Sequence, residues 1–404
     1  MKKLRVLFWG NSTHGNYKLA KIFKQFGHKV ELYMMSLDTL RSDPKHLDLK
    51  SYPNWIKQYD NVPFFKKIWV PKFLRDHVNN NFDVVIVCGL SIISSHSFKI
   101  PVLIFPTGGE LNDDPFFKKG HIIRPMRLIE CIIHNYSIQR SQKILSLGAF
   151  TYDVKAYARL RHKGILSFFT PVDKSFHIKM INKNLLKKLN EKYSKYDLVI
   201  LWLSRINMKK NSPNYKAPEK FLNETLQLLN TTKSKIKIIY GKHGTHIKEF
   251  ENKIKQSNKE IFFEAVPHLK YWELQTYLSI KNAVLVETMS DSGGNMSGMA
   301  RDCMALGTKM ITNYNEDVLS FYPEIWPIFK VNKNNDLLTH LQKILKWNKK
   351  DFKTHKLNIE HWFNRYMCSN EVFKFFEIKL RFEILLHKNK KPCIFPFSLF
   401  GRNK

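Results

Sequence analysis

Short apolar runs without polar alternation recur along the chain, and each is followed by a segment of helical length. They cover residues 4–9, 84–88, 102–105, 144–147, 198–203, 236–240, 284–287 and 309–312. Strands of a parallel sheet have this pattern, because helices cover both faces of such a sheet. We therefore predict an α/β fold with doubly wound parallel sheets.

The pattern occurs in two series. At roughly 150 residues per domain, the 404 residues suggest two or three domains. The second series begins after Pro171, and the charged run over residues 174–195 is expected to connect the two halves and to form a first surface helix of the second. The sequence thus predicts two α/β halves with a boundary near residues 170–195.

The net charge is strongly positive. Lys and Arg number 67 against 34 Asp and Glu, which gives +33. This charge favours an anionic partner, such as nucleic acid, an acidic lipid surface or a phosphorylated substrate. A base composition that favours Lys, Asn and Ile explains it equally well. We do not expect nucleic acid, because the basic residues are spread throughout and no nucleic-acid-binding motif occurs.

Cysteine usage and apolar run length bear on the cellular compartment. The five cysteines are scattered and none has CxxC spacing, so neither a disulfide framework nor a cysteine zinc site is expected. The first apolar run is too short for a signal peptide, and no run approaches the roughly 18 apolar residues of a membrane span. We therefore expect a protein of the reducing cytoplasm.

Eight segments, in order along most of the chain, resemble the retaining family-four glycosyltransferases, which have the GT-B fold and include many bacterial cell-surface sugar transferases. None of the segments is specific alone. They are the loop with Gly10 and Gly15 and residues 27–30 (GHKV), 105–111 (FPTGGEL), 144–152 (ILSLGAFTY), 170–173 (TPVD), 203–205 (LSR), 240–244 (YGKHG) and 302–308 (DCMALGT).

The resemblance implies two Rossmann-like domains that face a cleft. Residues 1–172 would form an acceptor-binding domain and residues 173–370 a nucleotide-sugar-binding domain. Residues 371–404 would form a helix that crosses back to the first domain and a basic aromatic tail. The implied donor is a nucleoside-diphosphate sugar, with no separate cofactor.

Sugar transfer from such a donor builds negative charge on the leaving diphosphate, so catalysis needs cations or N–H dipoles there. The resemblance assigns this role to Arg205 and a following lysine. Family spacing selects Lys210, whereas the phrase at residues 216–219 (KAPE) resembles the family's helix start and favours Lys216. No Asp-x-Asp metal motif sits at a strand end in the required context, so we expect no metal.

A glycine-containing loop precedes an expected helix at residues 297–306. Free N–H groups at a helix N-terminus attract anions, and glycines permit close approach of the backbone. The loop residues Gly293, Gly294 and Asn295 are therefore expected to contact the donor's phosphates or sugar. A tight strand-to-helix turn is the alternative.

Two acidic residues complete the family's donor site. Asp302 matches the one that binds the ribose hydroxyls, since a carboxylate accepts hydrogen bonds from a diol. The other, which contacts the donor sugar, should precede it by eight positions, where this chain has Gly294. Asp291 takes the role if the loop carries three extra residues, and Glu287 is the other nearby acid. A degenerate, inactive member is the alternative that this departure favours.

The remaining candidates come from other loops. His243, in the second domain, is expected to stack near the nucleotide base. In the first domain, His14 and Gly15 are expected to face the β-phosphate or the acceptor. The other acceptor-side candidates are Gly108, Gly109 and Glu110.

Three basic aromatic stretches point to a membrane surface. They cover residues 64–75, 116–127 and 388–404. Cations bind anionic leaflets, and aromatic rings sit at the headgroup level. We therefore expect a retaining, metal-independent glycosyltransferase that acts on a lipid-linked or surface-polysaccharide acceptor at the inner face of the membrane. The alternative is a catalytically degenerate partner subunit.

Overall fold

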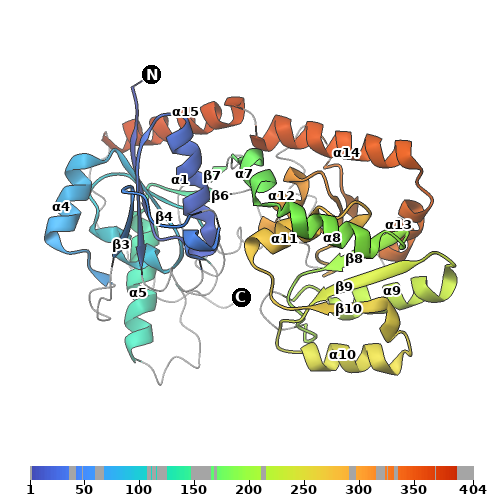
Figure 1. The fold of residues 1–404 in the computed structure, drawn as a ribbon. Coiled ribbons are helices and arrows are strands. Elements are labelled where there is room, and N and C mark those ends of the chain that lie inside the picture. Colours follow the sequence, from blue (N-terminus) through green and yellow to red (C-terminus); the bar gives the residue numbers. More distant parts are fainter. Residues whose placement is uncertain are drawn as a thin grey trace. The chain divides into compact units, whose positions relative to one another are not determined.

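The computed structural model describes residues 2–35, 42–47, 49–59, 68–106, 111, 115, 125–146, 165–167, 171–210, 215–290, 297–314, 324, 326–331, 335–368 and 370–388 (Figure 1). The chain divides into two compact units. One consists of residues 1–172 and 369–404, and the other of residues 173–368. Asp291, Gly293, Gly294 and Asn295 of the expected donor loop lie outside the described residues, as do Gly108, Gly109 and Glu110.

The first unit is built on a parallel sheet of seven described strands. Their spatial order is β3 (Ile56–Tyr59), β2 (Lys29–Met35), β1 (Arg5–Trp9), β4 (Val84–Val87), β5 (Val102–Ile104), β6 (Lys143–Ser146) and β7 (Ile165–Ser167). The helices are η1 (Ser12–His14), α1 (Gly15–Gln25), η2 (Pro44–His46), α4 (Lys72–Asn81), η3 (Gly89–Ser97), α5 (Pro125–Arg140) and α15 (Asn370–Lys388). Figure 1 shows α1 and α4 on opposite sides of the strands.

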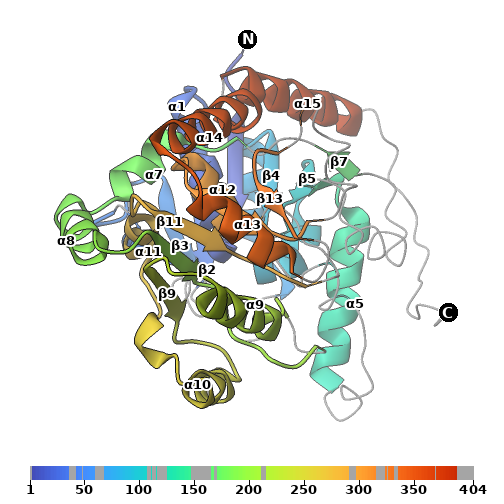
Figure 2. The same cartoon turned by 90° about the vertical axis from the view of Figure 1, so that its right-hand side faces the viewer.

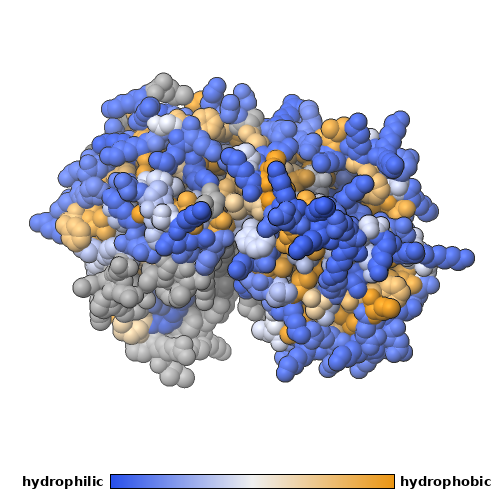
Figure 3. Space-filling model, in the orientation of Figure 1, coloured by the Kyte–Doolittle hydropathy of each residue, from blue (hydrophilic) through white to orange (hydrophobic). Residues whose placement is uncertain are grey.

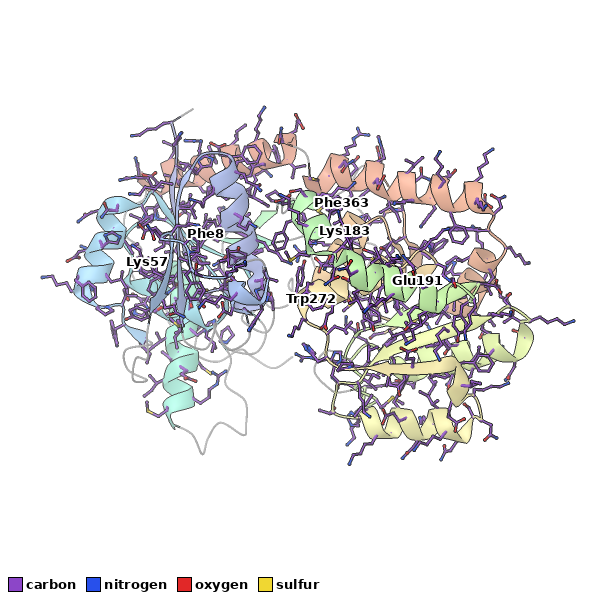
Figure 4. All side chains as sticks on the ribbon, viewed as in Figure 1. Phe8, Lys57, Lys183, Glu191, Trp272 and Phe363 are labelled. Atoms are coloured by element: carbon purple, nitrogen blue, oxygen red, sulfur yellow. The ribbon has the colours of Figure 1, made fainter. Side chains whose placement is uncertain are left out.

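The central strands are buried on both faces, as the continuous apolar runs predict. Trp9 pairs in register with Tyr33 on one side and with Val87 on the other. Its indole N–H donates a hydrogen bond of 3.0 Å to the Ser94 hydroxyl, which satisfies the polar atom of a buried ring. Phe8 points to the other face and meets Phe23 of α1 edge to face at 5.6 Å (Figure 4).

Helix α15 completes the first unit, although the whole second unit precedes it in the chain. Phe373 stacks on Phe26 with ring centroids 3.9 Å apart and meets Phe23 edge-on at 5.1 Å. Phe376 on the same face is fully buried. Full burial of one such ring contributes about 1.5–3 kcal/mol, so these contacts hold the helix to the unit.

The second unit contains a parallel sheet of six described strands. Their order is β10 (Phe263–Val266), β9 (Ile236–Gly241), β8 (Leu198–Trp202), β11 (Ala283–Val286), β12 (Lys309–Thr312) and β13 (Phe329–Lys330). The helical elements are α7 (Lys174–Met180), α8 (Lys183–Tyr193), α9 (Pro218–Thr231), α10 (Ile247–Gln256), η5 (Glu260–Phe262), α11 (Tyr271–Leu278), α12 (Gly298–Ala305), α13 (Asp336–Leu345), α14 (Lys349–Phe363) and the π-helical turn η7 (Asn364–Cys368). The predicted doubly wound α/β class is thus confirmed for both units.

Polar contacts fix the helices of the second unit. Asp173 and Asn182 cap α7 and α8 within the charged run that was expected to be helical. In a buried position of α9, the Glu224 carboxylate accepts a hydrogen bond of 3.1 Å from the Leu338 N–H in the first turn of α13. A carboxylate at a helix N-terminus satisfies a free N–H and interacts favourably with the dipole, so Glu224 joins α9 to α13 (Figure 2).

Many of the described lysines and arginines are exposed to solvent. Figure 3 shows hydrophilic residues over most of the surface turned to the viewer on each unit, with smaller apolar areas among them. Among the described residues, no helix is both long and apolar enough to cross a membrane.

Lys309, the first residue of β12, is an exception to this solvation. It is 8% exposed, and its ammonium lies 4.7 Å from the centre of the Phe352 ring. None of the described carboxylates pairs with it. Burial lowers the pKa of the Lys309 ammonium to about 8, and the nearby Lys356 adds to this effect. At neutral pH the folded chain therefore carries a buried charge that costs stability.

We expect Lys309→Met to stabilise the protein at pH 7 by about 1–3 kcal/mol, after allowance for the lost cation–π contact. Between pH 8 and 10.5 the unfolded chain retains the lysine proton and the folded chain releases it, so stability rises with pH there. The advantage of the variant should therefore shrink as the pH approaches 10. Urea denaturation at pH 7 and pH 9.5 measures this, with the exposed Lys248→Met as the matched control. An equal gain at both pH values would contradict the account.

Candidate functional site

The carboxyl edge of the second sheet holds most of the described candidate residues. Strand β8 has as neighbours β9, which follows it directly in the chain, and β11, which comes later. The chain therefore leaves β8 in one direction and β11 in the other, and the loops after these two strands diverge. Ligands of doubly wound sheets bind at such a point, because the diverging loops leave room there.

A buried ion pair lies at this point. The Lys216 ammonium pairs with the Glu287 carboxylate and donates a hydrogen bond of 3.2 Å to the Ser204 hydroxyl. Ser204 follows β8, whereas Glu287 directly follows β11 and has a side chain only 2% exposed. The pair thus connects the ends of two adjacent strands. One quarter of the Lys216 side chain remains exposed, so the ammonium can still be reached from solvent.

The backbone that carries Lys216 adopts a rare conformation. Ala217, the N-cap of α9, has φ 56° and ψ 56°, in the left-handed region. This conformation costs an L-residue about 1–2 kcal/mol relative to the right-handed one. The turn allows the Lys216 carbonyl to accept a hydrogen bond of 2.9 Å from the Met289 N–H, while the side chain turns to Glu287. Pro218 then begins the helix in its preferred first position.

Arg205, directly after Ser204, is exposed and differs from Lys216 in its surroundings. Its guanidinium forms no hydrogen bond or ion pair with another residue in the described part of the chain. It is close enough to His243 to contribute to the lowered pKa of that imidazole. Lys210, the other candidate lysine, is exposed in the loop beyond Arg205. Of these two candidate cations, Arg205 thus has no partner among the described residues, whereas Lys216 is paired with Glu287.

His243 lies in a turn that packs on the segment after β8. Ile206 N–H donates to the His243 carbonyl at 2.9 Å, and His246 N–H donates to the Ile206 carbonyl at 3.2 Å. Gly244 has φ +128°, and a Cβ there would lie 2.3 Å from the Ile206 carbonyl oxygen, so only glycine fits. The turn is thus held against the strand end that presents Arg205.

The His243 imidazole is neutral at physiological pH. Burial, with the adjacent His268 and Arg205, lowers its pKa to about 4. Its Nδ1 is buried and forms no hydrogen bond with any residue that the structure describes. A neutral imidazole can stack on a planar ligand, and its two ring nitrogens provide one donor and one acceptor. The expected contact with a base stays a prediction.

Asp302, the expected ribose ligand, already has protein partners. Its Oδ1 accepts a hydrogen bond of 3.1 Å from the Tyr271 hydroxyl, and its Oδ2 accepts one of 2.9 Å from the Gln275 amide. His177 Nδ1 lies 3.3 Å from Oδ1. Burial and the Asp302 carboxylate raise the pKa of Tyr271 well above its usual value, so its hydroxyl stays a donor. These contacts tie α12 to α7 and α11, and the ribose role stays a prediction.

Helix α12 begins as the sequence analysis expected, with Ser297 as its N-cap. The Ser297 hydroxyl accepts a hydrogen bond of 3.1 Å from the Ala300 N–H. Gly298, in the first turn, has no atom of the described residues within 4 Å of the place where a Cβ would stand. The first turn of α12 therefore presents backbone with open space beside it.

The first unit has a comparable loop at the carboxyl end of β1. Gly10 has φ +80°, and a Cβ there would lie 2.3 Å from the Ser91 hydroxyl. The two left-handed residues that follow are not glycines but Thr13, with φ 50°, and His14, with φ 59°. His14 is the N-cap of α1, and Gly15, its first residue, has an ordinary helical φ of −61°. The unusual backbone thus precedes Gly15.

Two buried asparagines hold this loop, and the sequence analysis did not single them out. Asn11 donates from its amide to the Ser42 carbonyl at 2.7 Å and accepts from the Tyr17 N–H at 2.9 Å. Asn16 donates to the Gly10 carbonyl at 2.9 Å. The position of Asn11 in a loop directly after a buried strand was the available signal, since asparagine there commonly bonds to the backbone. Asn16 lies in the first turn of α1.

The ion pair of Glu287 with Lys216 was not predicted from the sequence. The place of Glu287 at the end of an apolar run showed that it follows a strand, but a pairing over 71 residues leaves no local pattern. The contacts of His177, Tyr271 and Gln275 with Asp302 also join residues far apart in the sequence, so no local pattern predicted them. Among the described residues, no group of three or more His, Cys, Asp or Glu side chains could hold a metal ion.

No family model and no curated protein matches the sequence. Several solved structures share its fold. HepE of Anabaena, in complex with UDP and glucose, has a TM-score of 0.61 at 11% identity, over 94% of this chain and 99% of that one. A glycosyltransferase from Rickettsia africae has a TM-score of 0.64 at 13% identity, over 95% and 99%. Sucrose-phosphate synthase from Thermosynechococcus elongatus has a TM-score of 0.61 at 13% identity, over 94% and 99%. The chain therefore has the GT-B fold, as the sequence predicted.

We expect Ala217→Gly to stabilise the protein by about 0.5–1 kcal/mol, because glycine adopts the left-handed conformation without steric cost. The matched control is Ala265→Gly at an exposed position of β10, which should destabilise by about 0.5–1 kcal/mol. Urea denaturation of both variants gives the two signs. Destabilisation by both would show that Ala217 is not strained.

We expect Lys216→Met to destabilise the protein by about 3 kcal/mol, because it leaves the Glu287 carboxylate buried without a counter-charge. The double variant Lys216→Met, Glu287→Gln should lose less unfolding free energy than the two single variants lose together, by at least about 1 kcal/mol. A double-mutant cycle by urea denaturation measures the coupling. Additive effects would mean that the pair does not stabilise the site.

Proposed function

We propose that the protein transfers a sugar from a nucleoside-diphosphate sugar, with retention of configuration and without a metal ion. The observation that carries the proposal is the pair of cations at the switch point of the second sheet, with Arg205 unpaired and Lys216 partly exposed. The leaving diphosphate gains negative charge during transfer, and cations at that place stabilise it. HepE, which shares the fold, binds UDP and glucose, and this supports the same ligand class here.

The two cations have different roles in this proposal. Arg205 has no partner in the part of the chain that the structure describes, so a diphosphate would supply the acceptor oxygens that its planar guanidinium binds best. Lys216 is held by Glu287, so a diphosphate would have to compete with a buried carboxylate for its charge. Arg205 therefore contributes most of the binding energy for the diphosphate, and Lys216 stabilises the negative charge that develops on the leaving group during transfer.

The proposed acceptor is lipid-linked or a surface polysaccharide, and the first unit binds it. The loop with strained Thr13 and His14 supports this, because strained backbone at the end of a strand is typical of binding sites. The proposed location is the cytoplasm, on the inner face of the membrane. The positive charge of the chain supports an anionic membrane surface as a partner.

A second candidate function rests on the acidic residues. Glu287 is engaged by Lys216 and Asp302 by three side chains, and the family's first acid has no counterpart at its usual spacing. These observations favour a degenerate GT-B protein that acts as a partner subunit. Nucleotide binding distinguishes the two candidates, because a partner subunit without a donor site would not bind.

We expect one of UDP, GDP, ADP or CMP at millimolar concentration to raise the melting temperature by several degrees. A ligand at roughly 100 times its dissociation constant adds about 2.7 kcal/mol to the stability. Arg205→Ala should abolish the shift, and Arg205→Lys should retain part of it. The matched control is Lys255→Ala, an exposed cation of the same unit near the C-terminal end of α10, whose first turn is the part that follows the His243 turn. Lys210→Ala tests the alternative lysine, and we expect it to keep the shift.

With the donor thus identified, Arg205→Ala and Asp302→Ala should each lower sugar transfer by more than about tenfold. The melting temperature of each variant without ligand separates a lost contact from a lost fold. No shift with any nucleotide would favour the partner-subunit function. Transfer near the wild-type rate in both variants would exclude the proposed site.

A further inference from the structure

Helix α15 has two apolar faces, of which only one packs against the protein. The inner face carries Phe373, Phe376, Leu380 and Ile384, all buried in the first unit. The outer face carries five large apolar side chains that are between one third and three fifths exposed. They are Phe375 (46%), Ile378 (54%), Phe382 (58%), Leu385 (59%) and Leu386 (36%).

The spacing of the outer residues makes them one stripe. Their positions differ by three or four along the helix, except for the adjacent pair at its end, so they project to the same side over about three turns. A surface helix normally places polar residues there. A continuous exposed apolar area of this kind marks an interaction surface.

Two of the three acidic residues of α15 are buried. Glu377 and Glu383 are buried, where Glu377 pairs with Arg381 and Glu383 accepts a hydrogen bond of 3.0 Å from the Gln142 amide. The outer side carries cations beside the stripe. Lys374 and Lys388 are exposed, and the Lys379 ammonium lies 4.5 Å from the centre of the Phe375 ring. The exposed acid of the helix is Glu371, in its first turn.

The sequence beyond the helix continues this composition. Residues 388–404 contain no Asp or Glu, and they include Lys390, Lys391 and Arg402 together with three phenylalanines. An apolar stripe with cations on its flanks and a basic aromatic continuation matches an anionic bilayer, in which acyl chains lie beneath acidic headgroups.

We propose that the outer face of α15 binds in the plane of a bilayer that contains anionic lipids. The apolar stripe enters the boundary between headgroups and acyl chains, and Lys374, Lys379 and Lys388 contact the headgroups. A second copy of this chain would bring the same cations opposite one another, on a protein with a net charge of +33, so like charges oppose that occupant.

The inference specifies the surface for the membrane association included in the proposed function, and it does not depend on sugar transfer. A protein without any transferase activity would still bind vesicles through this face. Conversely, an active transferase could fail the vesicle test. The two proposals can therefore fail separately.

The test is sedimentation of the full chain with vesicles of phosphatidylcholine, alone or with about 30% phosphatidylglycerol, at about 0.1 M salt. The variant is the triple replacement Phe375→Ser, Phe382→Ser and Leu385→Ser. We expect strong binding of the wild type to the anionic vesicles only, and at least about a tenfold loss for the triple variant. The matched control replaces Ile261 and Leu357, which are 80% and 52% exposed in the second unit, by serine.

Two further measurements keep the test decisive. An unchanged melting temperature of the triple variant shows that the first unit remains folded, because the replaced side chains lie outside its core. A chain that ends at Lys388 separates the helix from the residues that follow it, and we expect it to retain binding.

Three outcomes would overturn the proposal. One is wild-type binding by the triple variant. A second is that removal of residues 389–404 abolishes vesicle binding while the triple variant loses no binding, which would assign the membrane contact to the tail. A third is a wild-type dimer by light scattering that becomes a monomer in the triple variant without any vesicle binding, which would make a second copy the occupant.

Discussion

All strands in each sheet run in the same direction, and this constraint decides where chemistry can occur in the molecule. Parallel pairing brings every carboxyl end to one edge, so residues far apart in the sequence meet there. Ser204 and Glu287 follow neighbouring strands, and the turn before α9 brings Lys216 between them. Helices cover both faces of the sheet, so this edge is the place where loop backbone and polar side chains reach solvent.

Much of this architecture could be predicted from sequence. The apolar runs predicted most of the central strands, because strands buried on both faces have few polar positions. The central strand β2, with Lys29 and Glu31, is not one of these runs. The edge strands β3, β7 and β13 were not predicted. β3 carries Lys57 and Gln58 between Ile56 and Tyr59, and β13 is only two residues long, so neither contains a continuous apolar run. An edge strand is solvated on one side, and its sequence resembles that of a loop.

The site was less predictable than the fold, for a physical reason. Arg205 and Lys216 could be found because they lie next to a strand end and a helix start, which leave local patterns. The partners of Lys216 and Asp302 could not, because ion pairs and hydrogen bonds between distant segments impose no spacing. Backbone conformation was also hidden. Gly10, named from the sequence, does have a positive φ, but Thr13, His14 and Ala217 have one as well without being glycines. Gly15, the other glycine named in that loop, has an ordinary helical conformation.

The position of α15 in the chain has a consequence for biosynthesis. Phe373 and Phe376 belong to the core of the first unit, yet the ribosome adds them after all of residues 173–368. At about 5–20 residues per second, the first unit waits roughly 10–40 s for its last helix, while the second unit is synthesised. During that interval the surface of Phe23 and Phe26 that α15 covers is open to solvent. The nascent chain is therefore expected to need a chaperone at its N-terminal half, and the order of domain folding is reversed relative to the order of synthesis.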